Sequence, residues 1–186
     1  MSTGNPALTP AVSSNDHAQG HKDAPITLVE YGDYECPYCG MAYPIVKRVQ
    51  ARFGERLRFV FRNFPIAEAH PHAVDAAELA EAAALQEKFW QMHDTLFEHQ
   101  RALGPEDLRR YATDIGLNFD ELELEFTSGE PQQAVRADLE GGIRSGVTGT
   151  PTFFVNGYRF VVDWRSEESF ATALDAFAPG LRRRAS

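Results

Sequence analysis

The chain has 186 residues, 43% of them hydrophobic, which is enough for one well-packed domain. A net charge of -9 and a pI near 5.1 argue against a nucleic-acid-binding surface, which needs a basic face. No apolar run approaches the length that spans a bilayer, so we expect no membrane insertion.

Residues 1–21 are rich in Ser, Thr, Asn, Pro and Gly and lack apolar periodicity, which predicts a disordered leader. The segment also has no apolar core of the kind that a signal peptide needs. The sequence as written therefore predicts a cytoplasmic protein. The alternative is the bacterial cell envelope, if a leader is missing or misassigned. At the other end, residues 180–186 predict a frayed basic tail.

The two cysteines of the chain stand together in Cys36-Pro37-Tyr38-Cys39. A β-rich apolar run at 26–31 predicts a buried strand before them, and apolar residues at helical spacing over 43–49 predict a helix after them. The motif therefore lies at a helix N-terminus, where free N–H groups and the helix dipole favour a thiolate. Cys36 is the candidate nucleophile, and Cys39, one turn on, is the candidate resolving thiol.

A zinc site and a structural disulfide are two other interpretations of the pair. A zinc site needs further ligands, but His70, His72 and the other histidines do not have zinc-site spacing from Cys39. A purely structural disulfide closing so short a loop removes little entropy from the unfolded chain. Redox chemistry is therefore the favoured interpretation, and it requires no metal or organic cofactor.

A second strand is predicted over 56–61, parallel to the first because a helix connects them. From 67 to 145 the pattern is helical, with starts at Pro71 and Pro105 and a stop at Gly116. The aromatic residues Phe89, Trp90 and Phe97 fit a substrate groove or a core, and their helical spacing favours the core.

The last third of the chain predicts a hairpin and a closing helix. A loop over 146–151 ends at Thr150-Pro151 and leads into a strand at 152–155, and Asn156-Gly157 is a strong turn signal before a strand at 158–162. A helix starting near Ser166 should turn Phe170, Leu174 and Phe177 inward.

These elements predict an α/β protein, with a four-stranded mixed sheet in the order second, first, third, fourth, and the last two strands antiparallel to the first two. The predicted domains are a sheet domain made of 22–66 and 146–179 and an inserted α-helical subdomain at 67–145.

The runs ITLVEYGDYECPYCG and GVTGTPTFFVNG, with RLRFVFRNFP and HPHAVDAAELAEAAA between them, resemble the DsbA family of thioredoxin-fold thiol–disulfide oxidoreductases. The same segments are similar to the thioredoxin-like domains attached to some bacterial sodium/proton antiporters. The resemblance covers about residues 22–178 and implies a thioredoxin fold with a helical insertion.

The resemblance also implies roles for individual residues. Cys36 and Cys39 match the nucleophilic and resolving thiols, and Thr150-Pro151 matches a cis-proline dipeptide that binds substrate beside them, together with Pro37 and Tyr38 of the motif. Glu30 matches a buried acid that helps to deprotonate the resolving thiol; the alternative is a strand residue that points to solvent or pairs with a nearby base. Tyr38 stands where DsbA itself has histidine, so the disulfide should be less oxidising.

The expected function is disulfide exchange with protein or small-molecule thiols and disulfides, by a monomer, in a direction that the sequence leaves open. One alternative is a non-catalytic thioredoxin-like module that regulates or binds a membrane transporter. A glutathione-transferase-like enzyme is disfavoured because Cys39 has no place in that chemistry.

Overall fold

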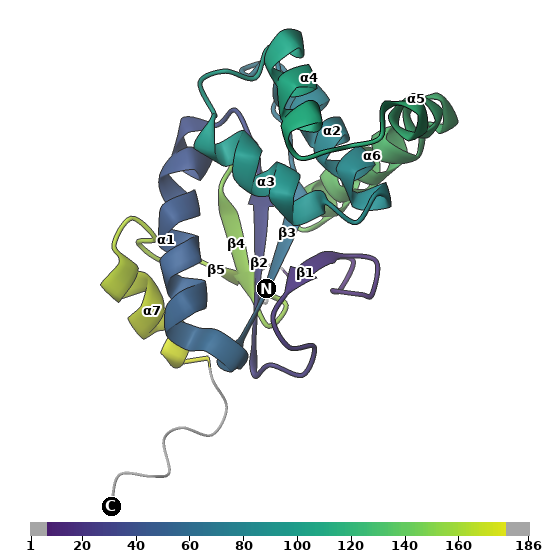
Figure 1. The fold of residues 1–186 in the computed structure, drawn as a ribbon. Helices are drawn as coiled ribbons and strands as arrows, with labels where there is room; N and C mark the ends of the chain where they lie inside the picture. The colour runs from purple at the N-terminus through teal and green to yellow at the C-terminus, as the bar shows by residue number, and fades with distance from the viewer. Residues whose placement is uncertain (1–6, 178–186) are drawn as a thin grey trace, which may run out of the picture.

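The computed structural model describes residues 7–177, which form a central mixed sheet with helices on both faces (Figure 1). In chain order the elements are β1 (His17–Gln19), β2 (Ile26–Gly32), α1 (Pro37–Phe53), the 3₁₀ turn η1 (Gly54–Arg56), β3 (Leu57–Asn63), α2 (Ala73–Leu85), α3 (Phe89–Glu98), α4 (Pro105–Asp114), α5 (Phe119–Ser128), α6 (Glu130–Arg144), β4 (Thr152–Val155), β5 (Tyr158–Phe160) and α7 (Glu167–Asp175). The predicted tail at 180–186 lies outside the described residues.

The sheet has the order β1-β3-β2-β4-β5, which confirms the predicted order of the four main strands. β2 and β3 are parallel, and β4 is antiparallel to β2. β5 pairs antiparallel with β4 through a turn in which Asn156 and Gly157 both have positive φ, as a two-residue hairpin requires. The prediction that both last strands oppose the first two is therefore wrong for β5, because a hairpin reverses the chain once more.

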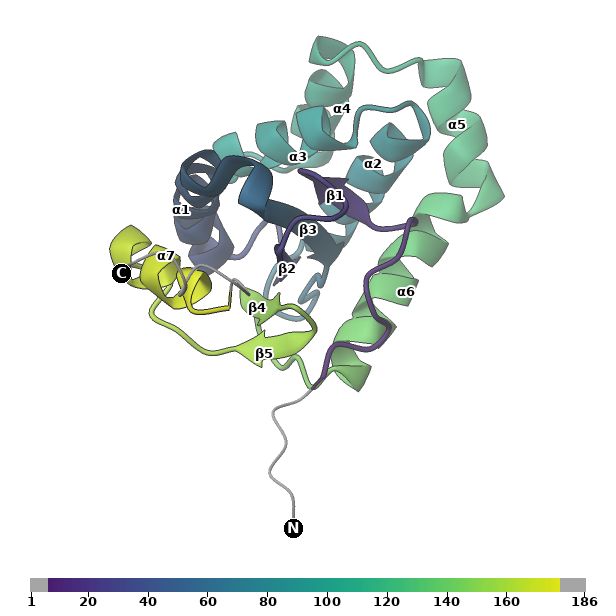
Figure 2. The ribbon, with the colours of Figure 1, turned by 90° about the horizontal axis from the view of Figure 1, so that it is seen from below.

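α1 and α7 lie together on one side of the sheet, and α6 lies on the other (Figure 2). Helices α2 to α6 all fall between β3 and β4, which confirms the predicted α-helical insertion of a thioredoxin fold. The division of the chain into two domains stays a prediction. No helix among residues 7–177 is long and apolar enough to cross a membrane.

Alternation along β2 separates two hydrophobic cores, because successive side chains of a strand point to opposite faces. Ile26 and Leu28 belong to the larger core, with α1 and the inserted helices, whereas Val29 and Tyr31 belong to a smaller core on the other face. The larger core includes the aromatic residues Phe89 and Phe97, as the core interpretation predicts. Glu30 follows Leu28 in this alternation, so it lies on the face that α1 covers.

The N-terminal segment differs from its prediction. Residues 7–21 are not a disordered leader: Leu8 is buried, and β1 adds an antiparallel strand at the edge of β3. The segment is held by polar contacts that a composition-based interpretation overlooks, above all a buried ion pair of 2.7 Å between Asp16 and Arg62. Arg62 also donates hydrogen bonds to the Pro10 carbonyl and the Tyr31 hydroxyl, so its charge is compensated inside the protein.

The end of the chain agrees with its prediction except at one residue. The Ser166 side chain caps α7 by accepting a hydrogen bond from the Ser169 N–H, and Phe170 and Leu174 are buried. Phe177, predicted to face inward, is 40% exposed because α7 ends at Asp175 and the inward periodicity ends with it.

Replacing Asp16 with asparagine should destabilise the fold by about 3 kcal/mol, because Arg62 would remain buried without its counterion. The two side chains are 8% and 3% exposed, so water cannot solvate the freed charge. The free energy of unfolding in urea measures the effect. Asp23→Asn is the matched control, since Asp23 is 72% exposed and should change stability by less than about 0.5 kcal/mol. Equal stability of D16N and D23N would contradict the account of the N-terminal segment.

Candidate active site

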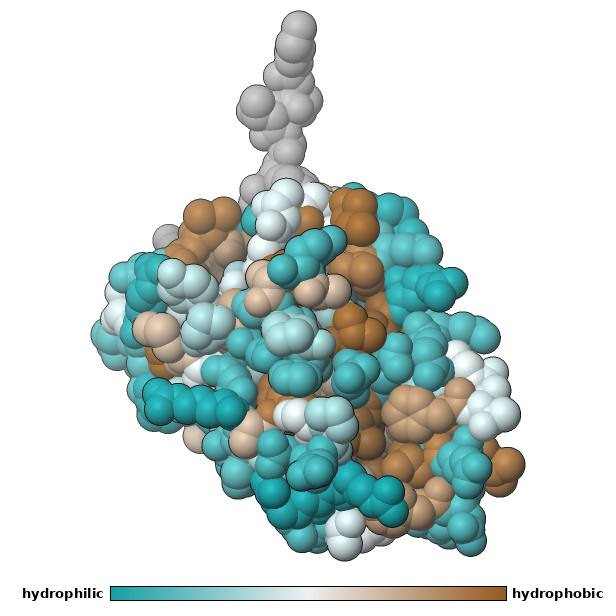
Figure 3. Space-filling view, turned by 90° about the horizontal axis from the view of Figure 1, so that it is seen from above, coloured by the Kyte–Doolittle hydropathy of each residue, from teal (hydrophilic) through white to brown (hydrophobic). Residues whose placement is uncertain are grey.

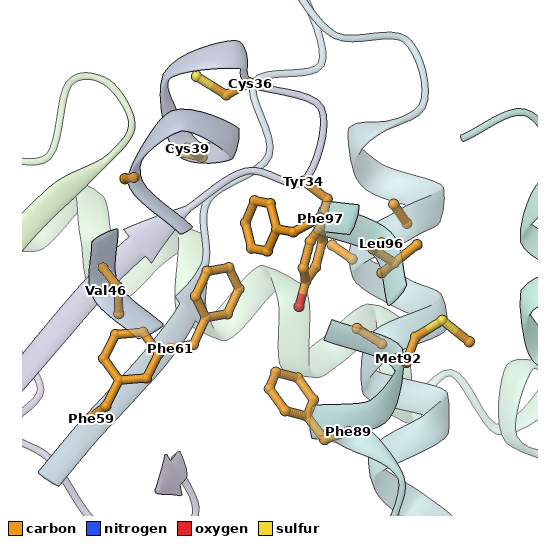
Figure 4. Close-up of a cluster of buried hydrophobic side chains, with 14 of the residues drawn as sticks. Tyr34, Cys36, Cys39, Val46, Phe59, Phe61, Phe89, Met92, Leu96 and Phe97 are labelled. Atoms are coloured by element: carbon orange, nitrogen blue, oxygen red, sulfur yellow. The ribbon is translucent and has the colours of Figure 1, made fainter. Parts of the chain in front are cut away.

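The two cysteines lie on the first turn of α1, at one end of the larger core (Figure 4). Cys36 is the N-cap residue with extended backbone, and Pro37 is the first residue of the helix, where a missing N–H costs nothing. No side chain caps this end of α1, so its N–H groups remain available to a negatively charged sulfur. The predicted helix N-terminal site is therefore present.

The loop before β4 brings Thr150 and Pro151 beside Cys36, although Pro151 lies 115 residues later in the sequence. The Thr150–Pro151 peptide bond is cis, as the resemblance implies. The Cys36 thiol lies 3.4 Å from the Thr150 carbonyl oxygen and donates to it. The Thr150 hydroxyl is buried with no other hydrogen-bond partner among the described residues, so it is free to donate to a thiolate.

The surroundings give the two thiols opposite properties. The pKa of Cys36 is lowered to about 5, chiefly by hydrogen bonding to the Cys39 side chain, and further by Thr150 and the backbone N–H groups of Cys39 and Tyr38. Burial raises the pKa of Cys39 well above its ordinary value, and Cys39 is fully buried, whereas Pro37 and Tyr38 between the two are exposed. At neutral pH the pair is therefore a thiolate at Cys36 and a thiol at Cys39.

Glu30 is a buried carboxyl below this pair. It is 3% exposed, and its Oε1 atom has no hydrogen-bond partner among the described residues. Burial, and then the charge of Cys36, raise its pKa to about 8, and its charge in turn raises the pKa of Cys39. The solvent-facing alternative for Glu30 is therefore wrong, and the acid is electrostatically coupled to both cysteines.

The surface around the pair is partly apolar. Tyr38 and Met41, on the first turns of α1, are both about half exposed, so they add apolar surface beside the cysteines. Figure 3 views the molecule from the end at which α1 begins, and apolar patches alternate there with hydrophilic ones. Such a surface suits contact with an extended chain.

Sequence reasoning missed the polar groups that hold the turn before α1. Asp33 is buried; its carboxylate lies 2.7 Å from His70 Nδ1 and accepts hydrogen bonds from the N–H groups of Glu35 and Ile66. The Gln100 side chain donates to the carbonyls of Tyr34 and Cys36. His70 is considered above as a zinc ligand, and neither His70 nor Gln100 has a sequence signal for these contacts.

The histidines considered as zinc ligands lie in different places. His70 contacts Asp33, whereas His93 is buried in the core with its ring hydrogen-bonded to the Tyr34 hydroxyl. His72 is the N-cap residue of α2, and its side chain makes no capping hydrogen bond. Within residues 7–177 there is no group of three or more His, Cys, Asp or Glu placed to hold a metal ion.

Solved structures share this fold. BdbD from Bacillus subtilis superposes with a TM-score of 0.79 at 23% sequence identity, covering 95% of this chain and 97% of that one. The thiol-disulfide exchange protein alpha-DsbA2 from Wolbachia pipientis superposes with a TM-score of 0.76 at 19% identity, covering 88% and 87%. These likenesses concern the fold.

Comparison of the amino-acid sequence with known proteins shows the family of the chain. The Na(+)/H(+) antiporter NhaA 1 of Salinispora arenicola is 42% identical over 177 residues, which are 95% of this chain and 27% of the relative. The chain thus spans about a quarter of the length of such relatives. A family model described as thioredoxin matches residues 12–176. The chain therefore belongs to this thioredoxin family.

Proposed function

We propose that the chain is a protein thiol–disulfide oxidoreductase that works through Cys36 and Cys39. The observation that carries this proposal is the opposite state of the two thiols one helical turn apart, with the pKa of Cys36 lowered to about 5 and that of Cys39 raised. A structural pair would have no need of this difference, whereas a nucleophile and a resolving thiol depend on it.

In the first step the Cys36 thiolate attacks one sulfur of a substrate disulfide. A bond forms between Cys36 Sγ and that sulfur, and the other substrate sulfur leaves with the electron pair of the broken S–S bond and takes a proton from water. The carbonyl of Thr150, freed from the thiol of Cys36, and the apolar surface at Tyr38 and Met41 are the groups beside which the substrate chain would lie.

In the second step Cys39 resolves the mixed disulfide. Formation of the mixed disulfide removes the negative charge of Cys36, which is one of the two causes of the raised pKa of Glu30. The pKa of Glu30 then falls, so Glu30 releases its proton to water more readily, and the ionised carboxylate can accept the Cys39 proton. Cys39 attacks Cys36 Sγ, the second substrate thiol leaves with a proton, and two electrons have passed from the protein to the substrate. The reverse sequence oxidises a dithiol substrate.

The direction of exchange, the compartment and the monomeric state remain part of the proposal. A reductase or redox partner fits the cytosol, where glutathione keeps such pairs reduced, whereas an oxidase requires the cell envelope. Tyr38 in place of an imidazole between the cysteines favours a couple less oxidising than DsbA.

A second candidate function rests on the sequence relatives. Because the relatives include proteins named as Na(+)/H(+) antiporters, of which this chain matches 27%, the domain would bind or regulate such a transporter without catalysis. This candidate predicts that a variant with both cysteines replaced by serine keeps its partner and its biological effect, and loss of the effect in that variant would exclude it.

Serine substitutions test the assigned roles directly. Cys39→Ser should accumulate a mixed disulfide between Cys36 and a model disulfide substrate, because the resolving thiol is absent, while Cys36→Ser should form none and lose insulin-reducing and thiol-oxidising activity. Non-reducing electrophoresis and turnover assays measure these outcomes. Undiminished turnover in C36S would refute the proposed function.

The ionisation of Cys36 should be visible in its reactivity. Alkylation of the reduced protein by iodoacetamide should reach half its maximal rate near pH 5. In C36S the remaining thiol is buried and its pKa is raised, so labelling should be far slower at every pH below 9. A wild-type midpoint near pH 8.5 would show that the first turn of α1 does not stabilise the thiolate.

Replacing Glu30 with glutamine should increase stability at neutral pH. Between the ordinary pKa of 4.5 and the folded value of about 8, the folded chain keeps a proton that the unfolded chain releases. The free energy of unfolding of the wild type therefore falls as pH rises through this window, and E30Q should exceed it by about 3 kcal/mol at pH 7. The gain should shrink towards pH 4.5, and urea titrations at several pH values measure it.

The exposed Glu55→Gln variant is the control for E30Q and should show no such pH dependence. In the same E30Q protein the release of substrate from a preformed mixed disulfide should be slower by about 10-fold or more, since Cys39 loses its proton acceptor. An E30Q variant that is less stable than the wild type at pH 7, or that resolves at the wild-type rate, would contradict the role of Glu30.

A further inference from the structure

His70 lies in the loop between β3 and α2, which folds back onto the turn between β2 and α1. Its Nδ1 atom is 2.7 Å from Asp33 Oδ2, and the two side chains are 17% and 0% exposed. The same carboxylate accepts hydrogen bonds of 2.8 Å from the N–H groups of Ile66 and Glu35, so its position is fixed from both loops. The orientation of the imidazole is therefore set by a buried anchor.

The backbone of Asp33 contacts both cysteines. Its carbonyl accepts a hydrogen bond of 3.2 Å from the Cys36 N–H, and its own N–H points to Cys39 Sγ at 3.5 Å. His70 is thus attached, through one buried residue, to the turn that holds both sulfurs. The motif itself has no imidazole, because tyrosine stands between Pro37 and Cys39, and the fold brings one from residue 70.

Three groups that become anionic act on His70: Asp33, the Cys36 thiol and Glu35. Burial lowers its pKa, but the hydrogen bond and charge of Asp33, the Cys36 thiolate and Glu35 together raise it above the ordinary value. At neutral pH the ring is therefore protonated more often than a free histidine. A cation near the first turn of α1 favours the thiolate form of Cys36.

We propose that His70, held by Asp33, is a positioning residue that stabilises the Cys36 thiolate and so makes the Cys36–Cys39 couple more oxidising. This inference rests on the proposed redox function and deepens it. In this proposal a histidine of the loop after β3, outside the C-x-x-C motif, stabilises the thiolate as an imidazole inside the motif would.

Oxidation of the Cys36–Cys39 pair should change the acidity of His70. In the reduced protein Cys36 is a thiolate, Cys39 carries its proton, and the raised pKa of His70 favours its protonated form. When the Cys36–Cys39 bond forms, two electrons pass to the substrate, the Cys39 proton leaves, and the thiolate charge disappears. His70 then loses one of the anions that raise its pKa, so oxidation makes it a stronger acid.

The experiment compares His70→Gln with the wild type by two readouts that do not require turnover. These are the pH profile of Cys36 alkylation and the equilibrium of the pair with glutathione at pH 7. H70Q should raise the Cys36 pKa by about 0.5 to 1 unit and shift the equilibrium about three- to tenfold towards the disulfide, because the reduced form loses its cation. His70→Lys, which keeps a positive charge, should restore the wild-type values.

The neighbouring His72→Gln variant is the matched control and should leave both readouts unchanged. The difference between H70Q and the wild type in the glutathione equilibrium should also shrink as the pH rises and His70 loses its proton. Thermal unfolding of each variant confirms that it is folded. Unchanged readouts in H70Q, or an equal shift in H72Q, would overturn the assignment of His70, whereas failure of the wild type to form the Cys36–Cys39 disulfide would refute the proposed function itself.

Discussion

The position of Cys36 at the N-cap of α1 is the constraint on which the rest of the candidate site depends. The end of the helix carries N–H groups with no backbone partner, and a thiolate at the cap satisfies them. The helix can begin at this residue because β2 ends at Gly32 and the turn to Cys36 is held by Asp33 and by the Gln100 amide. The sheet and the inserted helices thus cooperate to place one sulfur atom.

The same arrangement explains why acids surround a site that holds an anion. Burial, and then the charge of Cys36, raise the pKa of Glu30 to about 8, so Glu30 is mostly uncharged at neutral pH and adds little repulsion. Asp33 has its carboxylate engaged by two backbone N–H groups and by His70, so its charge is compensated locally. In the proposed mechanism Glu30 accepts the Cys39 proton, whereas Asp33 fixes the position of the His70 ring.

Much of the fold was predictable from the sequence because the signals are local. The period of the apolar residues, Pro105 and Ser166 at helix starts and Asn156-Gly157 at the hairpin each identify their elements without reference to the rest of the chain. The motif and its position at a helix start likewise identify Cys36 and Cys39. The resemblance supplied what no local pattern does, namely the cis bond at Pro151 and the burial of Glu30.

What the sequence did not predict depends on contacts between distant segments. The N-terminal segment looks disordered by composition, but Asp16 finds Arg62, 46 residues later, and the edge of β3 gives His17–Gln19 a partner. His70 contacts Asp33 because the loop after β3 returns to the turn before α1, which no local pattern indicates. Polar contacts of this kind produce no periodic pattern of residues in the sequence, so only the structure reveals them.

The reduction potential of the Cys36–Cys39 pair tests the central claim most directly, by equilibration of the wild-type protein with glutathione and thiol labelling. A Cys36 pKa of about 5 lies between the values of about 3.5 for DsbA and about 7 for thioredoxin. The account therefore predicts a two-electron couple with a potential between about -120 and -270 mV, near the middle of that range. A potential at or below about -270 mV, or no disulfide at any glutathione ratio, would contradict it.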